Sequence, residues 1–136
     1  MQNEVPEKTT PAVHLEHIGQ IAITVRDLAR SRDFYQNVLG MKLLFDAGRM
    51  AFFQCGAVRL MIGASEPEAS FSSGATILYF KVEDIHAAHT ALQALGVAFS
   101  HAPHLVARMK DHDLWMAFLN DPDGNPLALM SEVPSR

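Results

Sequence analysis

The chain is poor in several features, and each scarcity argues against a class of protein. Its only cysteine, Cys55, cannot form a disulfide within the chain, and we expect the thiol to be buried in the strand-like segment 50–55. The net charge of −4 argues against a nucleic-acid surface, and no apolar run is long enough to span a membrane. Residues 1–17 lack the charged-then-apolar pattern of a secretory signal. We therefore expect a cytoplasmic protein that binds neither nucleic acid nor a membrane.

What the chain does have is enough apolar material for one core. Of its 136 residues, 49% are hydrophobic and 19% are charged, against an average of about 25% charged. Residues 1–16 are polar and contain proline, which predicts a flexible N-terminal arm, and residues 133–136 are expected to form a tail. The segment between them, 17–132, predicts a single domain.

This domain repeats itself. Val25 and Asp27 recur as Val82 and Asp84 at an offset of 57 residues, and the Leu-Gly pair at 39–40 recurs at 95–96. Each aspartate is placed to cap a helix, and each glycine to end it. Each repeat, 17–65 and 75–132, therefore predicts a β-α-β-β-β unit in an α+β fold.

Short apolar runs rich in strand formers place the strands of both repeats. The expected strands are 18–25, 42–47, 50–55 and 58–64 in the first repeat, and 76–82, 97–101, 114–120 and 126–131 in the second. A single unit leaves an apolar sheet face uncovered. Two units together can enclose a cleft, which is a common place for a small ligand.

The stretch DPDGNPLALMSE, 121–132, has nearly the spacing of a helix-flanked calcium loop. Such a loop needs glycine at its sixth place, where this chain has Pro126. The flanking segments are also strand-like. We predict a hairpin turn in which Asp121 accepts backbone hydrogen bonds and Gly124 adopts a positive φ.

The repeat, together with two of its segments, resembles the vicinal oxygen chelate superfamily, which includes glyoxalase I, extradiol dioxygenases and bleomycin resistance proteins. The segments that carry the likeness are ITVRDLARSRDFYQNVLGMKLL (23–44) and MAFLNDPDGNPLALMSE (116–132). The resemblance implies paired βαβββ modules that form an incomplete barrel with a central cleft. It implies no single activity, because this fold supports many reactions.

The resemblance also implies four metal-ligand positions, two in each repeat. Counted from the strand-end valines and the turn glycines, they are Gln20, Leu60, Ile77 and Ala128. If the count from the glycines is one residue short, Met61 and Leu129 take the places of Leu60 and Ala128. Only Gln20 carries a group that coordinates a metal, whereas a catalytic metal requires about three protein ligands. We therefore predict a protein without the usual metal site and without a cofactor. The cleft would be apolar, with the amide of Gln20 and the phenol of Tyr79 as its polar groups.

A second candidate region is the segment 102–113, which has no counterpart in the first repeat. We predict a mobile loop that gates the cleft. Either it forms the rim of a pocket for an anionic or aromatic ligand, or it is a solvated basic loop. The rim residues would be His104, Arg108 and His112, with Trp115 as the wall behind them. Of the other histidines, His86 and His89 are expected on a solvated helix surface.

Two functions remain open at this point. The first is a protein that binds a small apolar or aromatic molecule without a metal. The second is a lyase, isomerase or dioxygenase that uses unorthodox residues, either a metal held by Gln20 with His104 or His112, or His112 as a general base. In both cases we expect a homodimer, because an apolar chain with little net charge has surface to cover.

Overall fold

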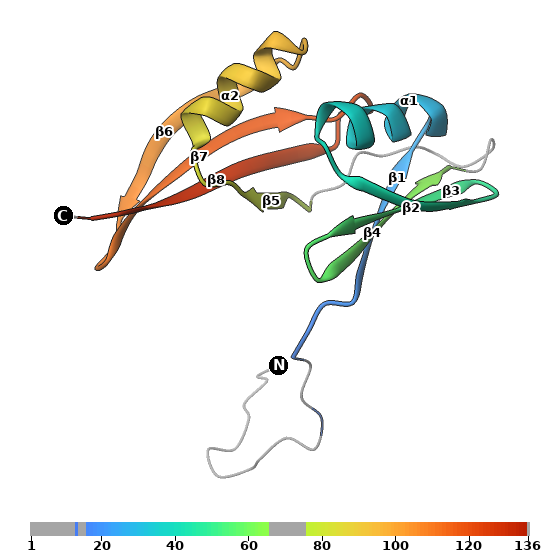
Figure 1. The fold of residues 1–136 in the computed structure, drawn as a ribbon, viewed down its shortest axis with the longest axis horizontal. Helices are drawn as coiled ribbons and strands as arrows, with labels where there is room; N and C mark the ends of the chain where they lie inside the picture. The colour runs from blue at the N-terminus through green and yellow to red at the C-terminus, as the bar shows by residue number, and fades with distance from the viewer. Residues whose placement is uncertain (1–12, 14–15, 66–75, 136) are drawn as a thin grey trace, which may run out of the picture.

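The computed structural model describes residues 13, 16–65 and 76–135, and these form two βαβββ modules (Figure 1). The first module contains β1 (Gln20–Val25), α1 (Leu28–Asp33), the π-helical turn η1 (Phe34–Val38), β2 (Lys42–Ala47), β3 (Met50–Cys55) and β4 (Val58–Ala64). The second contains β5 (Leu78–Lys81), α2 (Ile85–Ala94), β6 (Phe99–Arg108), β7 (His112–Asn120) and β8 (Pro126–Pro134). The predicted repeat and the α+β class are confirmed.

The two sheets have the same topology. Their strand orders are β1-β4-β3-β2 and β5-β8-β7-β6. In each sheet the first strand runs parallel to the last, and the remaining neighbours are antiparallel. The helix in each module makes the crossover that a parallel pair requires.

Local sequence explains where the helices begin and end. The carboxylates of Asp27 and Asp84 accept hydrogen bonds from the backbone N–H groups of Arg30 and Ala87, both at 3.1 Å. These bonds satisfy donors that a helix N-terminus leaves without partners. Beyond the helices, Gly40 and Gly96 have φ values of 75° and 92°, which glycine adopts at little cost.

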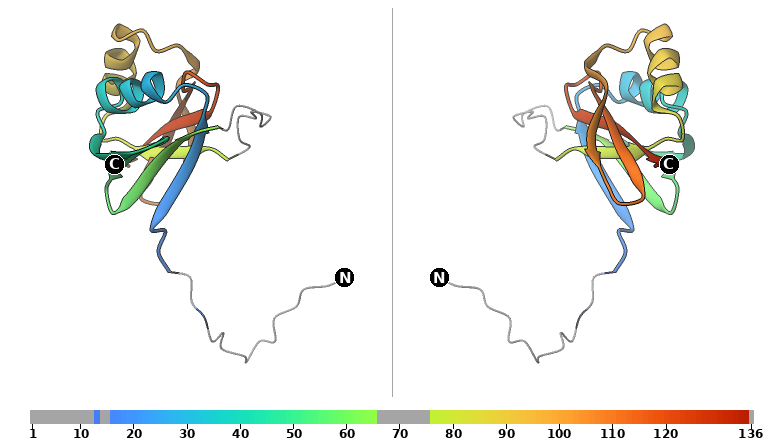
Figure 2. Two further views of the ribbon diagram at one scale, coloured as in Figure 1. Left: turned by 90° about the vertical axis from the view of Figure 1, so that its right-hand side faces the viewer. Right: turned by 90° about the vertical axis from the view of Figure 1, so that its left-hand side faces the viewer.

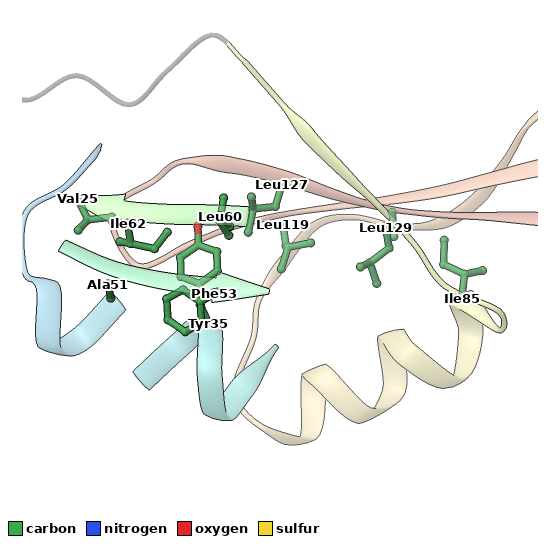
Figure 3. Close-up of a cluster of buried hydrophobic side chains, with 11 residues drawn as sticks. Val25, Tyr35, Ala51, Phe53, Leu60, Ile62, Ile85, Leu119, Leu127 and Leu129 are labelled. Atoms are coloured by element: carbon green, nitrogen blue, oxygen red, sulfur yellow. The ribbon is translucent and has the colours of Figure 1, made fainter. Parts of the chain in front are cut away.

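Both helices lie on the same side of the two sheets, and the core fills the space between helices and strands (Figures 2 and 3). The core runs without a break from Val25 and Tyr35 in the first module to Leu119 and Ile85 in the second. We call the sheet surfaces that point away from α1 and α2 the open faces. They lie next to each other on the other side of the molecule.

The segment 102–113 corrects the sequence-based expectation of a loop. Ala102–Arg108 continues β6, and β7 begins at His112, so only three residues connect the strands. The register of β6 against β7 shifts between His101 and His104, around Pro103, on a strand at the edge of its sheet. An edge position with irregular pairing is where a strand tolerates a residue without an N–H group. The segment is therefore a long hairpin.

The first two residues of the expected C-terminal tail belong to strand β8. Val133 and Pro134 of β8 pair with Asp113 and His112 of β7, and the N–H of Ser135 donates to the carbonyl of Asp111 at 3.2 Å. Most of the expected N-terminal arm lies outside the described residues. Within the part that the structure describes, no helix has the length and apolar character needed to cross a membrane.

Candidate functional site

The turn between β7 and β8 is the predicted hairpin turn. One carboxylate oxygen of Asp121 accepts from the backbone N–H groups of Asp123 and Asn125, at 2.9 and 2.8 Å. Gly124 has a φ of 85°. The carboxylate of Asp121 therefore shapes the loop, and the interpretation as a turn instead of a calcium loop is confirmed.

The same turn joins the two modules, which the sequence did not reveal. The hydroxyl of Tyr35, in η1, donates to the buried carboxylate of Asp121 at 2.9 Å, and the Asn125 amide donates to the carbonyl of Thr24 in β1 at 3.2 Å. Asp123 pairs with Arg30 at 2.8 Å and accepts from the Ser31 hydroxyl at 3.2 Å. We call this set of contacts the module clasp. Burial, and next the nearby charge of Asp121, raise the pKa of Tyr35, so its phenol stays protonated.

The open face of the first sheet carries a row of polar and aromatic side chains. Gln20 on β1 lies beside Arg59 on β4, and the Nε of Arg59 donates to the Oε1 of Gln20 at 2.8 Å. The guanidinium lies over the ring of Phe52, 5.5 Å from its centroid. Phe52 in turn stacks on Phe45, with centroids 4.6 Å apart. Met61 shares this face by strand alternation.

The open face of the second sheet carries an aromatic cluster around Phe118. Tyr79 meets the Phe118 ring edge to face at 6.2 Å, and His101 and His104 lie 5.5 and 6.1 Å from it. The Nδ1 of His104 lies 2.8 Å from the carbonyl oxygen of Ala102, which can only accept. This contact places a proton on Nδ1 and leaves Nε2 of the neutral ring as an acceptor toward solvent or a ligand.

A chain of charged groups crosses the far end of the second open face. Lys81 donates to Glu132 at 2.9 Å, and the Nε2 of His112 lies 4.0 Å from the other oxygen of Glu132. The Nδ1 of His112 is 2.7 Å from Asp111. The hydrogen bond from Lys81 lowers the pKa of Glu132, and the hydrogen bond with His112 lowers that of Asp111. Both carboxylates therefore remain ionised at neutral pH.

Most of the predicted site residues lie on the open faces. Gln20 is on the first, and Tyr79, Ala128, His104 and His112 are on the second. Ile77, two residues before Tyr79, is 36% exposed and precedes β5. The structure thus brings six of the nine predicted residues to the side that α1 and α2 leave uncovered.

Leu60 is a correction. It is 2% exposed and belongs to the core on the helix side, whereas its neighbour Met61 lies on the open face. Gly56 and Gly124 both lie two residues before the first paired residue of the next strand, but the count failed because Val58 shares the core face with Leu60 whereas Pro126 lies on the open face. Cys55 pairs with Val58 across a two-residue turn, whereas Asn120 pairs with Pro126 across five residues. A one-residue error moves a strand side chain to the opposite face.

Arg108 and Trp115 are also corrections, because they lie in strands, in which side chains alternate between two faces, and not at the rim of a loop. Trp115 packs against the core and meets the ring of His86, on α2, at 5.1 Å. Arg108 pairs with Asp113 at 3.4 Å, and Asp113 lies two residues before Trp115 on β7. Alternation therefore places this pair on the helix side and His112 on the open face. The expected rim is divided between two faces of the sheet.

The second helix holds a further correction. His86 packs on Trp115, and His89 meets the ring of Phe99 edge to face at 4.5 Å. The Nε2 of His89 is buried and has no hydrogen-bond partner. His86 remains exposed, in agreement with the predicted solvated surface, whereas the buried Nε2 of His89 contradicts it.

The hollows between the modules differ in size. Two of about 340 and 350 Å³ are lined by residues of both modules, the first by residues such as Phe34 and Val97, the second by residues such as Leu39 and Leu92. One of about 190 Å³ lies between β1 and the start of β8, and is lined by residues such as Ala22, Thr24 and Asn125. Another of about 170 Å³ lies under Tyr79 and Leu60. Ligand pockets usually measure roughly 300–1,000 Å³, so the two larger hollows reach this range and the two smaller ones do not.

The sequence model of the family described as "Glyoxalase/Bleomycin resistance protein/Dioxygenase superfamily" matches residues 17–129, which cover both modules. The chain belongs to this superfamily. It is 29% identical over 130 residues to catechol-2,3-dioxygenase of Bacillus subtilis, a match that covers 87% of this chain but 42% of that protein. The chain thus spans less than half the length of this relative.

Other relatives of this superfamily match the chain over nearly their full length. The uncharacterized protein YraH of Bacillus subtilis is 27% identical over 119 residues, which cover 78% of this chain and 91% of that protein. The structure of lactoylglutathione lyase from Agrobacterium tumefaciens superposes with a TM-score of 0.68 at 20% identity, over 90% of this chain and 96% of that one. At this identity the likeness shows the fold alone.

The superfamily's usual metal does not fit the residues found here. Of the side chains at the four family positions, Gln20, Met61, Ile77 and Ala128, only Gln20 offers an oxygen, and this oxygen already accepts a hydrogen bond from Arg59. A guanidinium at 2.8 Å also opposes a divalent cation by charge. Among the described residues no cluster of three or more His, Cys, Asp or Glu side chains has a metal-binding arrangement.

Proposed function

We propose that this superfamily member binds a small, mostly apolar or aromatic molecule on its open faces and does so without the superfamily's usual metal. The observation that carries the proposal is the chemistry of the family positions. An amide already engaged by Arg59, one thioether and two hydrocarbon side chains cannot supply the roughly three N, O or S ligands of a catalytic metal.

The surroundings of these positions support an aromatic ligand. Phe45 and Tyr79 are 48% and 46% exposed, one on each open face. Each belongs to an aromatic cluster, with Phe52 and Phe118 respectively. Aromatic side chains left exposed next to polar groups are typical of binding surfaces.

We propose further that the protein is a homodimer. The two open faces of one chain lie next to each other, so neither covers the other (Figures 1 and 2). A second copy can cover both faces and enclose a ligand. Sedimentation velocity at micromolar concentration tests this proposal, and a species with the mass of one chain would contradict it.

The direct test uses tag-free protein treated with EDTA and then dialysed. Calorimetry should detect binding of 2-naphthol or catechol, and addition of Fe²⁺, Mn²⁺ or Zn²⁺ should leave the affinity unchanged. The metal ions alone should not bind stoichiometrically. If neither aromatic compound binds, the binding function is wrong. If binding requires the metal, the proposal of metal-free binding is wrong.

The alternative function is an enzyme of the lyase, isomerase or dioxygenase type that works through His112. Its Nδ1 is held by Asp111 at 2.7 Å, which directs Nε2 toward Glu132 on the open face. An imidazole oriented by a carboxylate is the usual arrangement of a general base. Turnover of a bound compound that disappears in His112→Gln, with the affinity retained, would favour this function.

A further inference from the structure

Arg59 differs from other arginines that the structure describes. Arg30, Arg32 and Arg108 each form an ion pair with an aspartate, at 2.8, 3.0 and 3.4 Å. No carboxylate in the described part of the chain pairs with Arg59. Its side chain is instead held in place by the Gln20 amide and the Phe52 ring. The first open face therefore carries a fixed positive charge that no described carboxylate neutralises.

The hydrogen bond between these two residues determines what they present to a ligand. A guanidinium has no acceptor, so the atom of Gln20 that faces the Nε of Arg59 must be the amide oxygen. That leaves the NH₂ group of Gln20 and the two terminal nitrogens of Arg59 as the remaining polar atoms of the pair. All of them are donors, and the terminal edge of a guanidinium matches the two oxygens of a carboxylate.

An aromatic shelf lies beside this group of donors. Phe52 contacts the guanidinium and stacks on Phe45 with an interplanar angle of 21°, and Phe45 is about half exposed. Phe45, Phe52, Arg59 and Gln20 come from β2, β3, β4 and β1, so the row crosses the whole sheet. A planar ligand lying on the shelf would place an attached anionic group against Arg59.

We propose that Arg59 and Gln20 form an anion-binding subsite and that the ligand is an aromatic carboxylate. The guanidinium lies against Gln20, which stands at one of the metal-ligand positions that the resemblance implies, and supplies a positive charge of the protein's own. This inference rests on the proposed binding function and names the chemical class of its ligand.

The test compares matched probes that differ only in charge. Calorimetry at pH 7.5 and low salt would use 2-naphthoate against 2-naphthamide, and benzoate against benzamide. Wild type should bind each acid at least about tenfold more tightly than its amide, since a hydrogen bond to a charged group contributes that much. Raising the salt concentration should reduce this preference.

Variants then assign the preference to Arg59. Arg59→Met should bind the acid and the amide equally and should retain wild-type affinity for the amide. Arg59→Lys should keep part of the preference, because it retains the charge and loses the planar fork. The matched control is Arg32→Met, which removes the same charge from α1 on the helix side and should behave as wild type. Thermal unfolding of each variant shows whether it is folded.

The outcomes separate this inference from the proposed function. If the amides bind as tightly as the acids in wild type, or if Arg59→Met keeps the preference, the anion subsite is wrong while the binding function stands. If no acid and no amide of either pair binds to wild type, the anion subsite is wrong, and binding of 2-naphthol or catechol then decides whether the binding function stands.

Discussion

The two modules share one frame but carry different chemistry on their open faces. The first sheet has a cation, Arg59, fixed by an amide and supported by a stacked pair of phenylalanines. The second has an aromatic cluster with two imidazoles around Phe118 and a charged chain from Lys81 to Asp111. The same β-α-β-β-β pattern built both sheets, so the pattern determines which side chains face outward but leaves their chemistry free to diverge.

The hairpin turns differ just as much. In the first module Gly56 and Ala57 form a short exposed turn between β3 and β4. In the second, the equivalent turn is five residues long, and Asp121, Asp123 and Asn125 contact the other module. The longer turn therefore connects the two modules, which the turn between β3 and β4 does not do. Substitutions in the two turns test this difference.

The largest effect should come from breaking the module clasp at its centre. Asp121 is buried and accepts from Tyr35, from the amide of Asn125 and from two backbone N–H groups. Asp121→Ala leaves these donors without a partner and should lower the free energy of unfolding by about 3 kcal/mol or more. Urea denaturation measures the change. Ala57→Ser in the turn of the first module is the control, and should change it by less than about 0.5 kcal/mol.

A smaller loss should follow when only the link between modules is removed. Tyr35→Phe deletes the hydroxyl that donates to Asp121 and should cost about 1–2 kcal/mol at pH 7. Burial raises the pKa of Tyr35 in the folded state above that of the unfolded chain, so the unfolded chain ionises first as the pH rises. The stability of the wild type should therefore fall above pH ~10, and the difference from Tyr35→Phe should shrink there. A constant difference from pH 7 to 11 would contradict this.

The open face and the helix side of the second sheet should respond differently to ligand. Tyr79→Ala removes an exposed ring next to Phe118 and should weaken 2-naphthol binding about five- to tenfold. Arg108→Ala lies with Asp113 on the helix side and should leave the affinity unchanged. Calorimetry of both variants checks the division. Equal losses in the two would mean that the hairpin tip folds over the ligand from both sides.

The smallest effect should come from the exposed pair at the end of the second open face. The hydrogen bond from Lys81 lowers the pKa of Glu132 in the folded state, so its stabilising contribution is present at neutral pH and is lost as the pH falls through the carboxyl range. Glu132→Gln should have a slightly lower Tm than wild type at pH 7 and the same Tm at pH 3. A Tm difference that persists at pH 3 would show a cause other than this charge.

The helices and strands could be predicted from the sequence because each depends on residues that are close together in the chain. The strands 42–47, 50–55 and 58–64 were predicted with their observed bounds, as were the two helix caps and the glycines that end the helices. Alternation along short apolar runs and a carboxylate at an N-cap are properties of neighbouring residues. The repeat then predicted the β-α-β-β-β order of both modules, and the resemblance predicted the superfamily.

The sequence could not determine on which face of a sheet some of the predicted site residues lie. Leu60 was assigned to the ligand by a count from a turn glycine, but it lies in the core because the strands after the two turns begin on opposite faces. Arg108 and Trp115 were assigned to the rim of a loop, but the segment is a hairpin in which strand alternation places them on the helix side. Contacts between residues far apart in the chain were equally hidden.

By itself, then, the sequence determined the two βαβββ modules, the superfamily and the small number of metal-coordinating groups at the family positions, where Gln20 carries the amide. Only the tertiary structure decided that Arg59 lies against Gln20, that Tyr35 meets Asp121 across 86 residues, and that β6 and β7 form a hairpin in place of a loop. The physical reason is that strand formation and capping depend on near neighbours. The pairing of side chains across a sheet or between modules depends instead on strand register and packing, and neither can be predicted from neighbouring residues in the sequence.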